Sequence, residues 1–252
     1  MKAKRIFEIE AYINQQKAVT LEELCAHFDV SLNTIRRDIN ELTKLNRVKK
    51  VYGGVETLDP TLPSAVDYSD RNIENAASKK AIGRLAAKLI QPHDIIYIDT
   101  GTTTIHILDH VDKNLPFTII TNSLDVINKA SHFNHVELFI IGEQYKKTTR
   151  SFIGLETNVL LKKFNIQKAF MAATGVNINN GLSNSEIEEN HIKQIIMSKT
   201  AEAYVCVDHS KMNKSTLLTY APLNAIHTII TNQALPHNLQ HYASDHHIDV
   251  VY

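Results

Sequence analysis

The chain has 252 residues, of which 43% are hydrophobic and 21% charged, a composition typical of a folded protein with one small and one larger domain. Basic and acidic residues balance at 27 each, which excludes a protein that binds nucleic acid through an overall positive charge. Any DNA contact must come from a local patch. The two cysteines, Cys25 and Cys206, lie far apart in apolar surroundings and are expected to be free thiols.

The N-terminus is basic, but the residues that follow alternate between polar and apolar types and lack the hydrophobic core of a secretion signal. No later apolar run reaches the length of a membrane span. We therefore expect a cytoplasmic protein without a membrane partner.

The first part of the chain predicts two helices. Residues 2–16 carry isoleucines on one helical face, at Ile6, Ile9 and Ile13. Thr20 and Glu23 have the reciprocal capping pattern that begins a second helix, which ends near Asp29. Its apolar residues at helical spacing are Leu21, Leu24 and Phe28.

A third helix is predicted after Ser31, which is a good N-cap residue. Its inward face comprises Ile35, Ile39, Leu42 and Leu45. Its other face carries Asn33, Thr34, Arg36, Arg37 and Asn40. Residues of these types hydrogen-bond base edges and phosphates when they lie on a recognition helix in the major groove of DNA. The alternative is an amphipathic surface helix with a solvated charged face.

Two short β-type runs around Gly53 and Gly54 follow the helices and predict a small hairpin, or wing. Arg47, Lys49 and Lys50 on this hairpin are expected to contact DNA phosphates. Through residue 58 we count ten lysines and arginines against eight acids, a small excess. Tight binding would therefore require two or more copies on one operator.

The sequence here resembles the DeoR-type family of bacterial transcriptional repressors. The matching sequence motifs are Val30-Ser31, Thr34-Ile35-Arg36-Arg37-Asp38 and Tyr52-Gly53-Gly54-Val55. The resemblance implies a winged helix-turn-helix domain over residues 1–58. Its expected DNA-binding residues are Ser31, Asn33, Thr34, Arg36, Arg37, Asn40, Arg47, Lys49, Lys50, Tyr52 and Gly53.

Residues 59–74 are predicted to form a linker, because Pro60 and Pro63 among polar neighbours prevent a continuous helix. The second domain, residues 75–252, begins with a strongly helical segment at 75–91. Beyond it, apolar β-branched runs alternate with helical segments, at 95–98, 117–120, 136–141, 168–172, 203–207, 225–230 and 248–251. This alternation predicts an α/β domain with a mainly parallel open sheet covered on both faces. The sequence gives no strand order.

Polar residues gather where several predicted strands end, which is where ligands bind in such sheets. The candidate effector-binding residues are Asp99, Gly101, Thr102, Thr103, Thr104, Thr121, Asn122, Ser123, Asp208, Ser210 and Lys211. The turn around Gly101 is suited to hold a phosphate, with Lys211 as counter-charge. The alternative is that Thr102 or Thr103 simply caps a helix.

These residues extend the resemblance to the effector domain of the DeoR-type family, whose fold is similar to that of ribose-5-phosphate isomerase and coenzyme A transferases. The resemblance implies that nine of them line a pocket for a phosphorylated sugar or related metabolite, namely Asp99, Gly101, Thr102, Thr103, Thr121, Asn122, Asp208, Ser210 and Lys211. Two residues depart from the family pattern. Glu143 stands after Gly142 where a second glycine is usual, and Asn232 stands after Thr231 where an aspartate is usual.

The similarity to an isomerase raises the alternative of an enzyme with an accessory DNA-binding head. Asp99, Asp208, Lys211 and Glu186 are candidates for acid, base and electrostatic clamp in proton transfer beside a carbonyl. A sensor needs the same groups for the same ligand. The DNA-binding head, which an isomerase does not need, favours regulation.

Thirteen histidines raise the question of a metal site. His106 and His110 are four apart, as are His237 and His241, but no cysteine or carboxylate completes a known ligand spacing with them. We expect no metal site and no cofactor.

The sequence thus predicts a non-enzymatic repressor of a carbohydrate-metabolism operon, controlled by a phosphorylated sugar in the C-terminal domain. A homodimer or homotetramer formed through the larger domain would present paired heads to repeated half-sites on double-stranded DNA. Whether the effector releases the protein from DNA or secures it there is left open.

Overall fold

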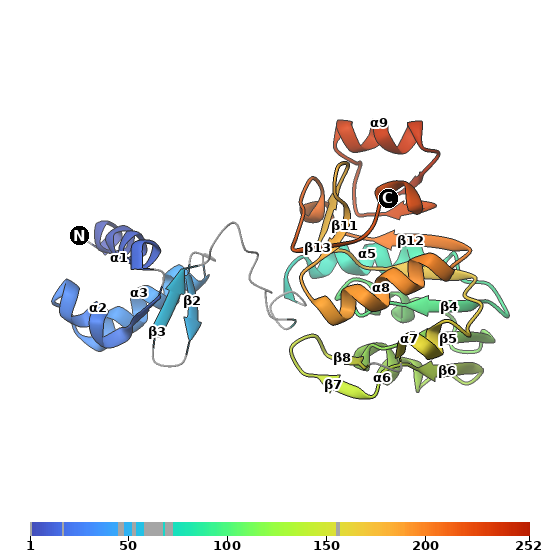
Figure 1. The fold of residues 1–252 in the computed structure, drawn as a ribbon, viewed down its shortest axis with the longest axis horizontal. Coiled ribbons are helices and arrows are strands. Elements are labelled where there is room, and N and C mark those ends of the chain that lie inside the picture. Colours follow the sequence, from blue (N-terminus) through green and yellow to red (C-terminus); the bar gives the residue numbers. More distant parts are fainter. Residues whose placement is uncertain are drawn as a thin grey trace. The chain divides into compact units, whose positions relative to one another are not determined.

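The computed structural model of the protein describes residues 2–16, 18–44, 48–51, 54–57, 68, 73–154 and 157–252. The chain divides into two compact units, Met1–Ser64 and Ala65–Tyr252, each of which is described by itself (Figure 1). Most of the linker predicted at 59–74, with Pro60 and Pro63, lies outside the described residues, so its bounds stay a prediction. No helix in the described part of the chain is long and apolar enough to cross a membrane.

The first unit, here called the head, contains three helices and a three-stranded antiparallel sheet. Its elements are α1 (Lys2–Gln16), β1 (Ala18–Thr20), α2 (Leu21–Phe28), α3 (Leu32–Lys44), β2 (Val48–Val51) and β3 (Gly54–Thr57), with strand order β1-β3-β2. The predicted capping box forms: the Glu23 amide donates to the Thr20 hydroxyl at 3.1 Å, and the Thr20 amide donates to the Glu23 carboxylate at 2.7 Å. Helix α2 ends at Asp29, which has a left-handed backbone conformation.

The head has its own hydrophobic core. Its fully buried side chains come from all three helices and the hairpin, and include Ile9, Ile13, Leu24, Ile35, Ile39, Leu42, Val48 and Val55. Each such side chain stabilises the fold by roughly 1.5–3 kcal/mol relative to an exposed one. The alternation of buried and exposed residues in α3 therefore fixes which face of that helix remains in solvent.

The second unit, here called the sensor domain, is built on a seven-stranded sheet in which every pairing is parallel. In spatial order the strands are β15 (Asp249–Val251), β14 (Thr228–Ile230), β12 (Glu202–Cys206), β9 (Lys168–Met171), β4 (Ile95–Ile98), β5 (Phe117–Thr121) and β6 (Val136–Ile140). Each of the seven predicted runs overlaps one of these strands, although the run at 225–230 is a strand only from Thr228 on and begins in the 3-10 helix Leu223–Ala225. The expected parallel open sheet is thus confirmed.

Helices cover both faces of this sheet, as its continuously apolar strands require. One hydrophobic cluster joins the sheet to α5 (Ala76–Ala87), the 3-10 helix η1 (Thr104–Asp109) and α6 (Leu124–Ala130). The other cluster joins the opposite face to α7 (Thr157–Leu161), α8 (Ile187–Lys199) and α9 (His237–Asp245). Cys206 lies in the first cluster, and both it and Cys25 are free thiols, as predicted.

Two small antiparallel elements were not predicted. One is a sheet of β10 (Gly175–Asn177), β11 (Gly181–Asn184) and β13 (Leu218–Ala221), and the other is a hairpin of β7 (Gln144–Lys146) and β8 (Ser151–Ile153). Their strands span three or four residues, too short to show a periodic pattern in the sequence. A glycine is required at Gly181, because φ is +66° there and a Cβ atom would lie 2.2 Å from the Ala221 carbonyl oxygen.

Candidate functional site

The exposed face of α3 is the candidate DNA-binding surface. Four of its predicted contact residues are exposed: Asn33, Arg36, Arg37 and Asn40. Thr34 is half-buried, and its amide donates to the Ser31 hydroxyl at 3.3 Å, so that Ser31 begins the helix as expected. Side chains of this kind at the first turns of a helix suit entry into the major groove. Their contacts with DNA stay a prediction.

A partly buried ion pair holds α3 against α1. The Arg5 guanidinium donates two hydrogen bonds to the Asp38 carboxylate, Nε to Oδ2 at 2.7 Å and Nη2 to Oδ1 at 3.3 Å. Asp38 has no exposed surface, although its neighbours Arg36 and Arg37 are exposed. The hydrogen bond from Arg5 to Asp38 raises the pKa of the Arg5 guanidinium. Asp38, the acidic residue of the motif at 34–38, thus orients the helix and is not on its exposed face.

The predicted wing places its two described lysines differently. Lys50 donates a hydrogen bond to Asn40 of α3, which brings the hairpin beside the exposed face of that helix. Lys49 pairs with Glu56 on the neighbouring strand, at 3.0 Å between Nζ and Oε1. Lys49 must leave this exposed ion pair to reach a phosphate. The predicted contacts Arg47, Tyr52 and Gly53 lie outside the described residues.

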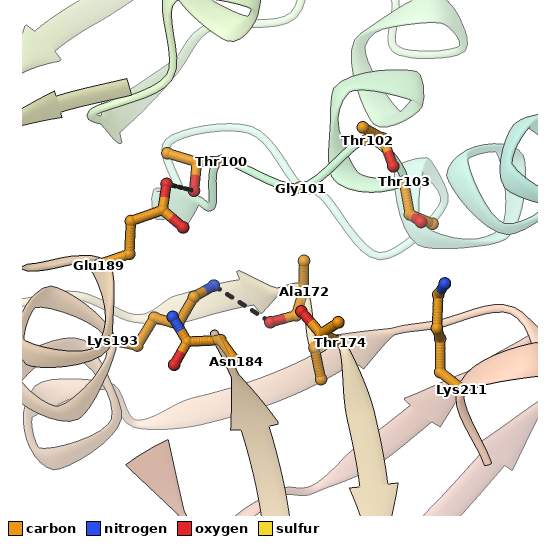
Figure 2. A pocket seen from close by; sticks show the side chains of 11 residues that line it. Thr100, Gly101, Thr102, Thr103, Ala172, Thr174, Asn184, Glu189, Lys193 and Lys211 are labelled. Carbon is orange, nitrogen blue, oxygen red and sulfur yellow. Dashed lines mark hydrogen bonds between the residues drawn. The ribbon is translucent and has the colours of Figure 1, made fainter. Parts of the chain in front are cut away.

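The sensor domain has a cleft at the carboxyl ends of β4 and β9 (Figure 2). From β4 the chain continues to β5 and β6 on one side, whereas β9, β12, β14 and β15 extend the sheet on the other. The cleft thus lies at a topological switch point, where ligands bind in open α/β sheets. Its empty space, including the part open to solvent, is about 500 Å³. The lining residues are Thr100, Gly101, Thr102, Thr103, Ala172, Ala173, Thr174, Asn184, Glu189, Lys193 and Lys211.

The turn after β4 forms one wall of the cleft. The Thr104 hydroxyl closes this turn by donating to the carbonyl oxygens of Asp99 and Gly101, at 2.7 and 3.0 Å. A Cβ atom on Gly101 would lie 2.2 Å from the Ala172 Cβ atom, so only glycine allows the turn to lie this close to the end of β9. Thr104 therefore supports the turn, while Thr102 and Thr103 line the cleft.

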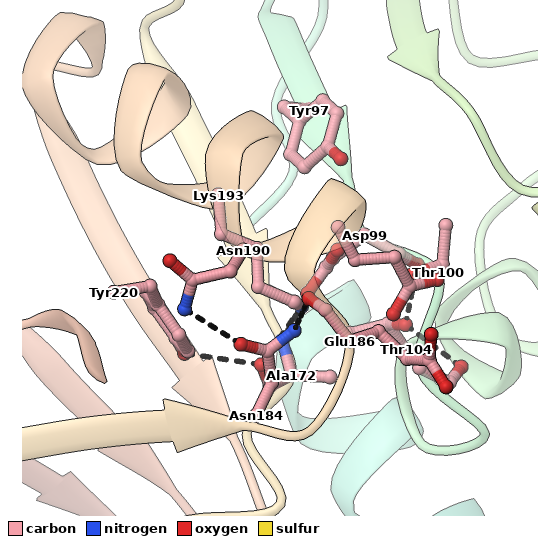
Figure 3. A network of polar contacts seen from close by, with 12 residues as sticks. Tyr97, Asp99, Thr100, Thr104, Ala172, Asn184, Glu186, Asn190, Lys193 and Tyr220 are labelled. Carbon is pink, nitrogen blue, oxygen red and sulfur yellow. Dashed lines mark hydrogen bonds and ion pairs between the residues drawn. The ribbon is translucent and has the colours of Figure 1, made fainter. Parts of the chain in front are cut away.

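A buried ion pair between Asp99 and Lys193 closes the floor of the cleft (Figure 3). Lys193 of α8 also donates to the Ala172 carbonyl oxygen at 3.1 Å, and the Ala172 amide donates to the Asp99 carboxylate at 2.8 Å. The Tyr220 hydroxyl donates to the same Ala172 oxygen at 3.0 Å. Because Asp99 and Lys193 neutralise each other, neither supplies an unpaired charge to a ligand.

Glu189 lies one turn before Lys193 on α8 and faces the turn after β4. Thr100 donates a hydrogen bond to its carboxylate at 3.0 Å. Burial raises the pKa of Glu189 above its usual value, and the nearby Asp99 raises it further, whereas Lys193 and the hydroxyls of Ser151 and Thr100 lower it. Glu189 thus binds a proton more readily than an exposed glutamate and repels an anionic ligand less.

Lys211 faces this cleft from a separate turn, the 3-10 helix η2 (His209–Lys211) (Figure 2). Asp208 caps that turn by accepting from the Ser210 amide at 2.9 Å. The Asn75 side-chain amide reaches the Asp208 carboxylate at 3.4 Å and the Ser210 hydroxyl at 3.5 Å. Asp208 and Ser210 thus position the turn, while Lys211 itself makes no ion pair with any residue that the structure describes.

The predicted residues after β5 support the fold beside the cleft and do not line it. Thr121 donates to the last carbonyl oxygen of β4 at 2.7 Å, and Ser123 caps α6. Asn122 accepts from the Tyr97 hydroxyl at 2.8 Å and donates to the Phe152 carbonyl oxygen at 3.1 Å. These bonds hold the hairpin of β7 and β8 against the sheet.

Sequence reasoning missed the residues that α8 and the small antiparallel sheet supply. From these elements come Asn184, at the end of β11, and Glu189 and Lys193 of α8. Four further lining residues were not named either: Thr100 in the turn after β4, and Ala172, Ala173 and Thr174, which follow β9. One signal was available: Glu189 and Lys193 are four residues apart in a helix and lie beside Ile192 and Ile196. Charged residues on the apolar side of a helix indicate burial with partners.

The two residues that depart from the family pattern, Glu143 and Asn232, are placed differently relative to the cleft. Glu143 is exposed and does not line the cleft. Asn232 accepts a hydrogen bond from the His209 amide at 2.9 Å and so supports the turn that carries Lys211. Among the described residues no group of three or more His, Cys, Asp and Glu is placed to hold a metal ion.

Comparison with protein families gives two matches that together span most of the chain. The DeoR-like helix-turn-helix domain matches residues 5–61, and the DeoR C terminal sensor domain matches residues 74–233. The second match alone covers more than half of the 252 residues.

Three characterised relatives are similar over nearly their whole length. The chain is 46% identical to the HTH-type transcriptional regulator IolR of Bacillus subtilis, over 99% of both chains. It is 29% identical to the L-fucose operon activator of Haemophilus influenzae, over 95% of this chain and 96% of that one. It is 27% identical to the lactose phosphotransferase system repressor of Staphylococcus aureus, over 91% of both chains.

Proposed function

Because the chain belongs to the DeoR family of DNA-binding transcriptional regulators, we propose that its cleft binds a phosphorylated sugar or related metabolite and thereby controls operator binding. One observation carries this proposal: the Lys211 ammonium faces the Thr102 and Thr103 side of a cleft whose other lysine is already neutralised. A cation beside hydroxyl groups is suited to a phosphate dianion.

The two ends of the cleft suggest how such a ligand is oriented. The end near Lys211 and Thr102 is cationic and suits the phosphate. The opposite end carries the amide of Asn184 and the carboxyl of Glu189, which can bond hydroxyl or carbonyl groups of the carbon chain. The ligand class is therefore a polar, singly phosphorylated carbohydrate derivative.

Lys211→Ala is expected to weaken sugar-phosphate binding by roughly 10- to 100-fold, because a hydrogen bond to a charged group contributes about 1.5–3 kcal/mol. Binding is measured as the rise in melting temperature with a panel of pentose and hexose phosphates. Lys214→Ala, an exposed lysine outside the cleft lining, is the matched control. A Lys211→Ala protein with the wild-type midpoint and normal operator binding would remove Lys211 from the site.

We assign the protein as a repressor of a carbohydrate-metabolism operon. The lactose phosphotransferase system repressor supports this direction of control, and the L-fucose operon activator is the relative that argues for the opposite one. Deleting the gene should raise transcription of the target operon. A fall in that transcription would make the protein an activator.

The protein is proposed to act in the cytoplasm as a homodimer or homotetramer that presents two heads to paired half-sites. The small charge excess of the head supports this assignment, because a single head offers few contacts to phosphates. Symmetric half-sites on operators mirror the symmetry of the protein that binds them.

An isomerase-like enzyme is the second candidate, and the geometry of its proposed acids and bases supports it less. Asp99 is paired with Lys193, and Glu186 is paired with Lys146 at 2.5 Å. Asp208 caps a turn, so only Lys211 of the four candidates lines the cleft. Incubation with sugar phosphates, followed by NMR, decides the matter: isomer formation would overturn the sensor-only assignment.

A further inference from the structure

Tyr68 is a buried residue of the segment that joins the two family matches. It lies between residue 61, where the helix-turn-helix match ends, and residue 74, where the sensor match begins. Within the sensor domain its side chain is only 4% exposed. The Arg150 guanidinium lies over its ring, 5.9 Å from the centroid, within the range of a cation–π interaction. Tyr68 itself is thus packed against the sensor domain.

The binding partner of Tyr68 is an ion pair between Asp125 of α6 and Arg150. Arg150 donates two hydrogen bonds to the Asp125 carboxylate, from Nε at 2.9 Å and from Nη2 at 2.5 Å. Burial alone would raise the pKa of Asp125, but the hydrogen bonds from Arg150 hold it below its usual value. Ring, guanidinium and carboxylate therefore form one connected unit, here called the Tyr68 anchor.

The Tyr68 anchor is connected to the cleft through the next residue of the chain. Arg150 has a left-handed backbone, with φ at 54°, and directly precedes Ser151 of β8. Ser151 is fully buried, and its hydroxyl bonds to the Thr149 hydroxyl at 2.7 Å. It also lies close enough to Glu189, which lines the cleft, to lower the pKa of that residue. A left-handed conformation at a residue other than glycine persists only when its surroundings hold it.

A second contact ties the same hairpin to the cleft helix. Lys146 of β7 forms ion pairs with Glu186 and Glu188, at 2.5 and 2.9 Å, just before Glu189 in the chain. The hairpin thus contacts α8 beside the cleft through β7 and β8, and carries the Tyr68 anchor at its turn. A displacement of the start of α8 would therefore reach Arg150 through this two-stranded hairpin.

We propose that the Tyr68 anchor is the docking site through which cleft occupancy controls the segment leading to the DNA-binding head. The proposal rests on the proposed function, since it names the route by which the effector acts. A ligand that rearranges the hydrogen bond between Thr100 and Glu189 shifts the start of α8, to which Lys146 ties the hairpin, and so changes the position of Arg150. For coupling, the ligand must bind the docked and released states of Tyr68 with different affinity.

The first test uses the full chain and needs no ligand. The protein contains no tryptophan, so Tyr68→Trp provides a single fluorophore at the anchor. Glu189→Gln or Ser151→Ala in that background should increase acrylamide quenching at least twofold, whereas Glu137→Gln, on the exposed edge strand β6, should leave it unchanged. Equal quenching in all of these proteins would overturn the proposal.

The second test measures operator affinity with and without ribose 5-phosphate or another sugar phosphate that raises the melting temperature. Tyr68→Leu should retain that rise and the affinity measured without ligand, but the ratio of the two affinities should fall to about one. Tyr145→Leu, an exposed tyrosine of the same hairpin, should keep the wild-type ratio. If Tyr68→Leu keeps the wild-type ratio of operator affinities with and without ligand, the role of the Tyr68 anchor alone is overturned. If the wild-type protein forms isomers or binds no sugar phosphate, the proposed function is overturned.

Discussion

Lys193→Met should lower the free energy of unfolding of the sensor domain by about 3–5 kcal/mol, because it leaves the buried Asp99 carboxylate without its cation. Both side chains are almost fully buried, at 5% and 2% exposed, so water cannot replace the lost partner. Lys193 also bonds the Ala172 carbonyl oxygen, which lies at the end of the central strand β9. The loss therefore affects the floor of the cleft and the sheet together.

The double variant Asp99→Asn with Lys193→Met separates charge from packing. Removing both charges should restore most of the stability lost in Lys193→Met, because no unpaired ion is then buried. Urea unfolding followed by circular dichroism gives the free energies, and Lys199→Met, an exposed lysine of the same helix, is the control. If the single and double variants lose the same free energy of unfolding, the ion pair between Asp99 and Lys193 does not stabilise the floor of the cleft.

Arg36→Ala and Arg37→Ala should each weaken operator binding by about 1–3 kcal/mol, or roughly 5- to 150-fold, since each would remove one predicted contact to a base or phosphate. Both side chains are exposed, so neither substitution should change the melting temperature. Arg84→Ala, an exposed arginine on α5 of the sensor domain, should bind as the wild type does.

The operator can be obtained by selecting duplexes from a random library with the wild-type protein. Affinities are then compared at one fixed salt concentration, because phosphate contacts depend strongly on salt. Replacing an arginine that reads a base should relax specificity at one position of the operator. Replacing one that binds a phosphate should weaken binding to all sequences equally. Wild-type affinity in both variants would place the DNA-binding surface elsewhere on the head.

Much of the fold could be predicted because local patterns determine it. The capping box at Thr20 and Glu23 and the β-branched run at 95–98 act within a few residues, and both form where expected. The strand order could not be predicted, because pairing between β4 and β9 joins segments about seventy residues apart in the chain. The small sheet and the hairpin are too short for periodicity to reveal them.

The candidate site was predictable only in part for the same reason. Gly101, Thr102 and Thr103 follow a strand directly, and their place at its carboxyl end follows from chain order. Glu189 and Lys193 reach the cleft from α8, whose packing on one face of the sheet only the tertiary structure determines. The residues after β5 were expected in the pocket, but the cleft lies between β4 and β9, on the other side of β4.

We propose that this chain joins a DNA-binding head to a metabolite-binding cleft, and that occupancy of the cleft controls the head. The most direct test is a titration of the selected operator with wild-type protein, in the absence and presence of a sugar phosphate already found to raise its melting temperature. We predict that operator affinity changes by about 5- to 150-fold, the usual range for coupling between two sites. Unchanged affinity under saturating ligand would contradict the account.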